Sequence, residues 1–381
     1  MRSVSPGGRC TQVANGLRRA VVGVVLAVRI GRAQAAPLVV PDEPLCPACQ
    51  ITLSTVARLG AKDGPGSLSQ SPIAVRVDPL GRYWLFPGGG GPPIVYDSTG
   101  RFLKVIGSRG GGPGEFRWSV DVVFLAPDSA LVMDIENHRM VIVGSDLVPR
   151  GEMPFLLDVS PLVNGGGRGR FFASSLVRTP ESMGWPLHQI ELRDGELSLT
   201  RSFGPDAGVM PTTSSRNFVW NLAPAWYDGF WSEDPNRMRF VRWSSDGAIK
   251  EYLERRAAWF PETPILDAGA PTRPPKPFAK GMSEQPAGIL WTFTLLPSPR
   301  WREAWPKDLP ESGEIKASSI DVSKLFESMI EVIDVKQRRV ITRVRLEDLL
   351  SGALPGGRAW APRIDDDGFW FIEIKQFRVV R

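Results

Sequence analysis

The chain has 381 residues, with 46 Lys and Arg, 41 Asp and Glu, and a formal net charge of +5. Six of the basic residues lie within the first 35 positions, which contain no acidic residue, so the rest of the chain is close to neutral. Nucleic-acid-binding domains concentrate basic residues on one face, and this composition excludes that class.

The first 35 residues have the layout of a secretory signal peptide. A basic start is followed by an apolar run at residues 20–28, and the small residues Ala33 and Ala35 precede the expected cleavage point. The apolar run covers about nine residues, whereas a membrane-spanning helix needs roughly twenty. We therefore expect a periplasmic or secreted protein without a membrane span. Arg18 and Arg19 leave twin-arginine export open as an alternative to ordinary secretion.

Residues 36–50 show no pattern typical of a strand or helix and are expected to be irregular. They contain Cys46 and Cys49, separated by Pro and Ala. An exported protein can keep a disulfide between such a pair, whereas a redox role would require a thioredoxin-like βαβ context. A zinc site would need two further ligands. We expect the pair to be structural or incidental.

From residue 51 onward, short apolar strands alternate with turns. Gly and Pro interrupt the chain every eight to twelve residues or so, and the apolar residues lack helical spacing, which favours strands. The clearest unit has four expected strands, at residues 73–78, 82–86, 93–96 and 101–106. Further units are expected at residues 120–153, 155–204, 217–255, 278–346 and 359–381.

The two ends of the chain complement each other. The last unit has only three expected strands, whereas residues 51–60 form a strand that belongs to no unit of its own. Pairing them would close a ring and cover two exposed sheet edges. The sequence therefore predicts an all-β fold, a six-bladed β-propeller over residues 51–381, closed by an N-terminal strand that completes the last blade. An insertion at about residues 297–325, ending in a short helix, interrupts the fifth blade.

A second repeat places a glycine two or three positions before a tryptophan. Each copy is expected to be a tight turn that leads into an inner strand, with the tryptophan packed between neighbouring sheets rather than stacked on a ligand. The pairs are Gly81 with Trp84, Gly229 with Trp231, Gly288 with Trp291 and Gly368 with Trp370.

One segment, VMDIENHRMVIV at residues 132–143, resembles the core of an NHL repeat at Asp134, Asn137, His138, Arg139 and Met140. From residue 51 onward, the chain resembles in architecture the six-bladed β-propellers of the NHL-repeat and TolB-like superfamily, although only this one repeat is close in sequence. The resemblance implies that His138 belongs to the packing and hydrogen-bond pattern between strands.

Motifs that would carry chemistry are absent from the sequence. The glycine runs at residues 88–91 and 110–114 lack the Lys-Ser/Thr of a phosphate loop, and there is no Gly-x-Ser-x-Gly or His-Glu-x-x-His motif. The carboxylates at residues 365–367 are expected to stabilise a turn. Those at 233–234 would hold calcium only if other oxygens converged on them. We predict no cofactor, no metal site and no catalytic residue.

By analogy with other propellers, the loops after the outermost strands and those between the middle strands share one face around the channel mouth. They would present five candidate ligand-binding residues, although solvated loop charge is the alternative for each: Arg109, Glu115, Arg117, Glu136 and His138.

We predict an exported, monomeric, non-catalytic module that binds an unknown protein or small-molecule ligand. One alternative is a metal-dependent hydrolase or lyase of the propeller lactonase type, which would need several acidic, Asn or His ligands converging on the axis. Scaffolding in an envelope complex is the other alternative.

Overall fold

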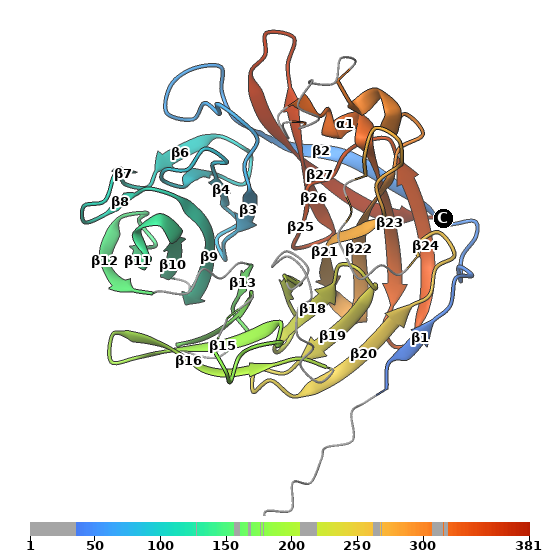
Figure 1. The fold of residues 1–381 in the computed structure, drawn as a ribbon, viewed down its shortest axis with the longest axis horizontal. Coiled ribbons are helices and arrows are strands. Elements are labelled where there is room, and N and C mark those ends of the chain that lie inside the picture. Colours follow the sequence, from blue (N-terminus) through green and yellow to red (C-terminus); the bar gives the residue numbers. More distant parts are fainter. Residues whose placement is uncertain are drawn as a thin grey trace, which may run out of the picture. The chain divides into compact units, whose positions relative to one another are not determined.

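The computed structural model confirms the predicted fold class: the described part of the chain is a six-bladed β-propeller with almost no helix (Figure 1). The structure describes residues 36–126, 128–155, 161–166, 169–175, 177, 179–205, 219–261, 267, 269–306, 315 and 319–381. The predicted signal peptide, residues 1–35, lies outside them.

Each blade has four antiparallel strands that follow the order of the chain from the channel outward, except that the outermost strand of blade 6 comes from the N-terminal part of the chain and blade 4 gains a fifth, parallel strand from there. Blade 1 contains β3 (Ala74–Val77), β4 (Tyr83–Phe86), β5 (Ile94–Tyr96) and β6 (Phe102–Val105). Blade 2 contains β9 (Ser119–Ala126), β10 (Ser129–Asp134), β11 (Arg139–Gly144) and β12 (Pro149–Pro154). Blade 3 contains β13 (Leu162–Val163), β14 (Arg170–Ser174), β15 (Leu187–Arg193) and β16 (Glu196–Phe203).

The next two blades follow the same order. Blade 4 contains β17 (Asn221–Pro224), β18 (Phe230–Asp234), β19 (Arg239–Trp243) and β20 (Ile249–Arg255). Blade 5 contains β21 (Phe278–Gln285), β22 (Ile289–Pro297), β23 (Phe326–Asp334) and β24 (Arg339–Leu346). The described part of its insertion holds two short helices, η4 (Trp301–Ala304) and α1 (Val322–Leu325), so the expected helix at its end is present.

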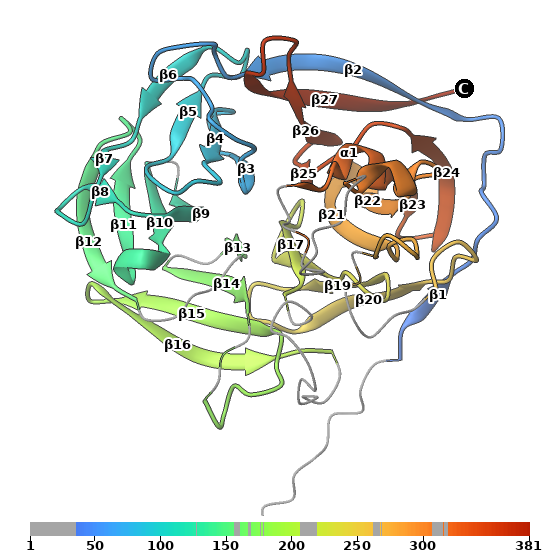
Figure 2. The ribbon, with the colours of Figure 1, turned by 45° about the horizontal axis from the view of Figure 1, so that its top comes forward.

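Blade 6 is built from both ends of the chain, as the sequence predicted. Strands β25 (Gly352–Leu354), β26 (Arg358–Ile364) and β27 (Trp370–Val380) are completed by β2 (Gln50–Leu59). Strand β2 pairs antiparallel with β27, from Gln50 opposite Val380 to Leu59 opposite Ile372, and the two run side by side in Figure 2. The ring is therefore closed by hydrogen bonds between residues more than 300 positions apart.

The segment before β2 differs from the irregular loop that we expected. Residues Leu38–Val40 form β1, which pairs in parallel with β20 and gives blade 4 a fifth strand. The chain then crosses blade 5, where the amides of Leu45 and Cys46 donate to carbonyls of β24. We call residues 38–59 the outer belt, because they follow the outer edges of blades 4, 5 and 6. Three apolar residues in a row are too few to predict a strand from the sequence. They also pair with β20, which lies more than 200 positions later in the chain.

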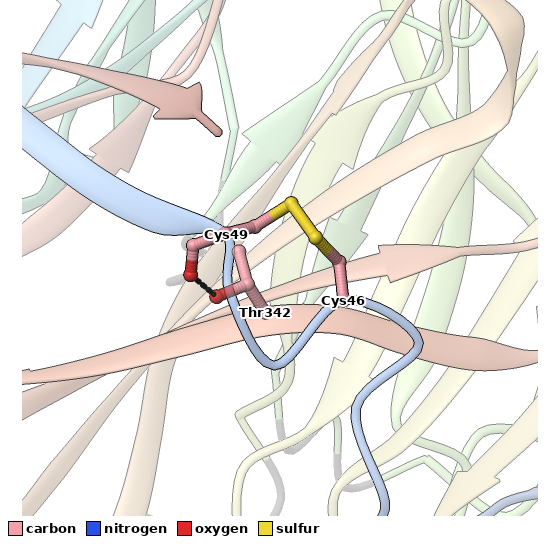
Figure 3. The surroundings of a disulfide bond; sticks show 3 residues. All are labelled: Cys46, Cys49 and Thr342. Carbon is pink, nitrogen blue, oxygen red and sulfur yellow. Dashed lines mark hydrogen bonds between the residues drawn. A yellow bond between two sulfur atoms is a disulfide. The ribbon is translucent and has the colours of Figure 1, made fainter.

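The structure joins Cys46 and Cys49 by a disulfide within the outer belt (Figure 3). The carbonyl of Cys49 accepts a hydrogen bond from Thr342 Oγ1 of β24 at 2.7 Å. The amide of Cys49 donates to the carbonyl of Cys46, so the disulfide closes a single tight turn. This turn lies against the outer edge of blade 5.

The core lies between neighbouring blades. Trp84, Trp231 and Trp291 are buried, as expected, in the second strands of blades 1, 4 and 5, whereas Trp370 is half-buried. Gly229 shows why its turn requires glycine, since its φ is +81° and an added Cβ would lie 1.7 Å from the carbonyl oxygen of Trp243. The turns lead into inner strands, as expected: three lead into second strands and Gly368 leads into the third strand of blade 6, each with a neighbouring strand on both sides. No helix among the described residues is long and apolar enough to cross a membrane.

Candidate functional site

The first strands of the six blades surround a central cavity of about 510 Å³. Figure 2 shows these six strands, β3, β9, β13, β17, β21 and β25, around the middle of the ring. Most of the wall is apolar and comes from Val, Leu, Ala, Pro and Met side chains. The lining extends past the strand ends into the turns at residues 78–81, 224–226 and 355–358. The cavity therefore lies toward the face that carries the turns between first and second strands.

Glu284, at the end of β21, places a carboxylate in the cavity wall. Its Oε2 accepts hydrogen bonds from the amide of Trp226 at 2.7 Å and from Trp231 Nε1 at 3.0 Å. No described group donates to its Oε1. The residue is 8% exposed, whereas the neighbouring turn presents Trp226 at 50% and Tyr227 at 80% exposure. A fixed carboxylate oxygen is thus tied to a turn whose Trp226 also lines the cavity.

Arg358, at the start of β26 in blade 6, places a guanidinium in the cavity wall. Its Nε donates to the carbonyl of Pro355 at 2.9 Å, and its Nη1 donates to Tyr83 Oη at 3.0 Å. Its guanidinium carbon lies 5.9 Å from the centre of the Tyr83 ring. These contacts fix the side chain, and within the described residues Nη2 has no acceptor.

The other charged groups of the wall are paired inside the protein. Arg76 forms two contacts with Asp121, at 2.8 and 3.0 Å. Asp78 accepts from Arg82 Nε at 2.6 Å and from Trp84 Nε1 at 3.0 Å. Within each pair the two opposite charges neutralise each other. Glu284 and Arg358 are therefore the charged groups of the wall that a ligand could meet.

A buried hydroxyl also lies at this wall. Ser283 lines the cavity, is 3% exposed, and has no hydrogen-bond partner for its Oγ among the described residues. It lies directly opposite Trp291 in the β21–β22 pair, and Trp291 Nε1 is also buried without a described partner. Buried polar groups normally have partners, so these two lack the hydrogen bonds that such groups usually form, and no role in binding follows from them.

The five residues expected from the sequence lie elsewhere, in the loops between blades 1 and 2 and at the β10–β11 turn. Arg109 is in β7 (Ser108–Arg109), Glu115 in β8 (Glu115–Phe116) and Glu136 in η1 (Ile135–Asn137), with Arg117 and His138 next to these elements. None of the five is among the residues that line the cavity. In an antiparallel blade these loops lie at the opposite strand ends from the turns that form the cavity wall. A binding role for them stays a prediction.

These residues do come together as a structured loop cluster. Glu115 Oε2 accepts from the amide of Gly112 at 2.8 Å, and Arg109 donates to the carbonyl of Gly89 at 3.2 Å. The amide of Arg117 donates to Asp134, which also accepts from Asn137 Nδ2 at 2.6 Å. The backbone and side-chain contacts that the structure shows therefore hold the loops against the hairpin.

His138 occupies the left-handed corner of the β10–β11 hairpin, with φ +49°, and its side chain is exposed. The same corner recurs in blades 4 and 5 at Met238 and Arg338, with φ of +47° and +55°. In all three hairpins the corner lies between the two members of a cross-strand Asp–Arg pair: Asp134 with Arg139, Asp234 with Arg239 and Asp334 with Arg339. This hairpin motif is thus shared more widely than the sequence indicated.

The acidic pair at residues 233–234 is not a solvated loop. Glu233 is fully buried in β18, and its Oε2 accepts from Asn221 Nδ2 at 2.9 Å. Burial raises the pKa of Glu233 to about 8, because the charged form is desolvated; the bond from Asn221 opposes this shift and nearby Asp234 adds to it. A carboxyl that is protonated at neutral pH is a poor cation ligand.

The remaining metal candidates also have structural roles. Asp365 Oδ1 accepts from the amides of Asp367 and Phe369, as expected of a turn. His188 is buried, its Nε2 donates to the carbonyl of Ser175 at 2.9 Å, and burial lowers its pKa. Within the described ranges, no three His, Cys, Asp or Glu side chains are grouped so that they could hold a metal ion.

Sequence reasoning missed Glu284 and Arg358, the two charged residues of the cavity wall that have no described partner of opposite charge. A weak signal exists, since Glu284 stands four residues before Gly288 much as Asp78 stands three residues before Gly81. The two carboxylates also do similar work, because each accepts from the indole of a buried tryptophan. That role requires knowledge of which strands are neighbours, which no local pattern provides.

No protein-family profile and no curated protein matches the chain. Among solved structures, a Bacteroides fragilis protein named as exported is 10% identical with a TM-score of 0.57, covering 91% of this chain and 100% of its own. A DUF4221-family member from Bacteroides vulgatus is 10% identical with a TM-score of 0.59, covering 87% of this chain and 99% of its own. At this identity the likeness is one of fold alone.

Proposed function

We propose that the protein is an exported binding protein that takes a small organic ligand into its central cavity. The observation that carries the proposal is the cavity itself, about 510 Å³ in volume and bounded by the first strands of all six blades. Small-molecule sites are typically concave, mostly apolar and about 300–1,000 Å³, with a few fixed polar groups. The cavity wall fits that description.

A binding role is favoured over catalysis by what the acidic side chains of the wall do. Asp78 and Glu284 already accept hydrogen bonds from indole and main-chain donors that fix them in place. Such fixed groups orient a ligand without having to move. Export, a monomeric state and membership of the NHL-repeat and TolB-like superfamily are further parts of the proposal. The leader composition supports export, and the propeller fold supports the superfamily.

The test is a titration with anilinonaphthalene sulfonate, an apolar fluorescent probe. We expect saturable binding by the wild type, weakened at least about ten-fold in Ala353→Phe, which fills the cavity from β25. Ala258→Phe, at an exposed position, is the matched control and should bind like the wild type. If Ala353→Phe perturbs the far-ultraviolet circular dichroism, Ala225→Phe fills the same cavity from blade 4. Equal probe binding by a folded filled variant and the wild type would overturn the proposal.

A further inference from the structure

On the basis of the proposed function, we infer that the cavity takes an ampholytic ligand, one that carries an ammonium group and a carboxylate at its two ends. Amino acids and short peptides are ligands of this class. The inference rests on two charged side chains of opposite sign, which line one cavity and have one unused polar atom each.

The ammonium end is assigned to Glu284. Its Oε2 is occupied by two donors from blade 4, which fixes the plane of the carboxylate and leaves Oε1 for the ligand. Trp226, half exposed on the same wall, adds an aromatic face. A carboxylate beside an aromatic ring attracts an ammonium group both by charge and by a cation–π interaction.

The carboxylate end is assigned to Arg358. Two of its nitrogens are held by Pro355 and by Tyr83 of blade 1, so the guanidinium cannot swing out to solvent without losing both bonds. Its Nη2 donates to no described group and is available to a ligand. Arginine donors form strong, charge-assisted hydrogen bonds with carboxylates, and fixing the fork beforehand lowers the entropy lost on binding.

The two charges cannot satisfy each other in the way that the other wall charges do. Glu284 is tied to blade 4 and Arg358 is tied to blade 1, and the structure shows no ion pair between them. Arg76 and Asp78, by contrast, each have an internal partner of opposite sign. A ligand with both charges would complete the two half-satisfied groups at once, and an apolar chain between its ends would lie against Val123, Leu162 and Leu222.

The test uses calorimetric titration with three ω-amino acids of increasing length: aminobutyrate, aminocaproate and aminocaprylate. Caproate and hexylamine serve as probes that each lack one charge. The best ω-amino acid should bind at least about ten-fold tighter than either. The variant Glu284→Gln keeps an acceptor for the Trp226 and Trp231 donors. It should weaken the ω-amino acids and hexylamine but not caproate. Arg358→Gln should weaken the ω-amino acids and caproate but not hexylamine. Exposed Glu196→Gln should leave the affinity for every probe unchanged.

Equal affinity for the three probe types would overturn the inference, as would a loss of the same size for every probe in Glu284→Gln. Failure of all these probes to bind would also overturn it. If anilinonaphthalene sulfonate still binds in the cavity in that case, the proposed function stands and only the ampholytic class is wrong. Should Arg358→Gln misfold, Arg358→Lys keeps the charge without the fork and should weaken the ω-amino acids and caproate, leaving hexylamine unaffected.

Discussion

At the scale of single residues, burial decides what a side chain can do, and the sequence shows burial poorly. In the sequence, Glu233 is only a conditional calcium candidate and Glu284 is not singled out, yet Glu233 is fully buried and Glu284 nearly so. The two carboxyl groups differ in the number of hydrogen bonds that they accept. Glu284 has two donors on one oxygen, whereas Glu233 has one and no described donor to Oε1. Burial with few donors favours the protonated form.

The pKa of Glu233, about 8 when folded against an ordinary value of 4.5, predicts a pH-dependent stability. The folded state binds more protons than the unfolded state between these values. Stability from the protonated carboxyl is therefore full at low pH and lost as pH rises toward about 8. Neutral Glu233→Gln lacks this loss. Thermal melts between about pH 5 and pH 9 should show the variant gaining on the wild type as pH rises, until about pH 8.

Exposed Glu196→Gln is the control for that experiment, because it removes a carboxyl of the same type from the outer strand of blade 3. A constant difference between Glu233→Gln and wild type across the pH range would contradict the assignment. It would show that the carboxyl is ionised in the folded protein.

At the scale of elements, most strands were predicted because their signals are local. In blade 1, every boundary of the four expected strands lies within one residue of β3 to β6, because turn residues, including the Asp-x-x-Gly turns at 78–81 and 97–100, separate the apolar strands. The outer belt shows the limit of such signals. Asp42 in the belt accepts hydrogen bonds from Arg255 of blade 4 and Arg343 of blade 5. Those contacts join three chain segments that no local pattern relates.

The closing strand β2 offers a matched pair of substitutions. Leu59 is fully buried between blades 6 and 1, whereas Leu53 on the same strand is 40% exposed. Leu59→Ala should lower the free energy of unfolding by about 2–5 kcal/mol, through lost burial and the cavity left behind. Leu53→Ala should change it by less than about 0.5 kcal/mol. Urea unfolding at equilibrium measures both, and equal effects would mean that β2 is not packed as a core strand.

At the scale of the whole molecule, the pairing of β2 with β27 closes the ring. We therefore expect stability to depend on that pairing more than on where the chain begins and ends. Val380 lies opposite Gln50, which places the C-terminal end of β27 beside the start of β2. A permuted chain that starts at residue 61 and carries residues 50–59 after Arg381, through an Asn-Gly turn, should therefore fold.

Three chains test that expectation by circular dichroism and gel filtration. The permuted chain should melt cooperatively near the temperature of a chain of residues 50–381, which also lacks β1 and the disulfide. A chain of residues 61–381 leaves the edge of β27 unpaired and should aggregate or unfold. Stable, monomeric folding of that shortest chain would show that closure by β2 is dispensable.

The sequence by itself determined the all-β class, the six units and the strand that closes the ring, because turn residues, period-two alternation and an incomplete last unit are all local patterns. Only the tertiary structure decided where the central cavity lies and which charges line it. Glu284 and Arg358 acquire their roles from partners on other blades, at Trp231 and Tyr83. Hydrogen bonds and burial between distant segments leave no periodic trace in the chain, so the residues of the cavity wall could not be identified from the sequence.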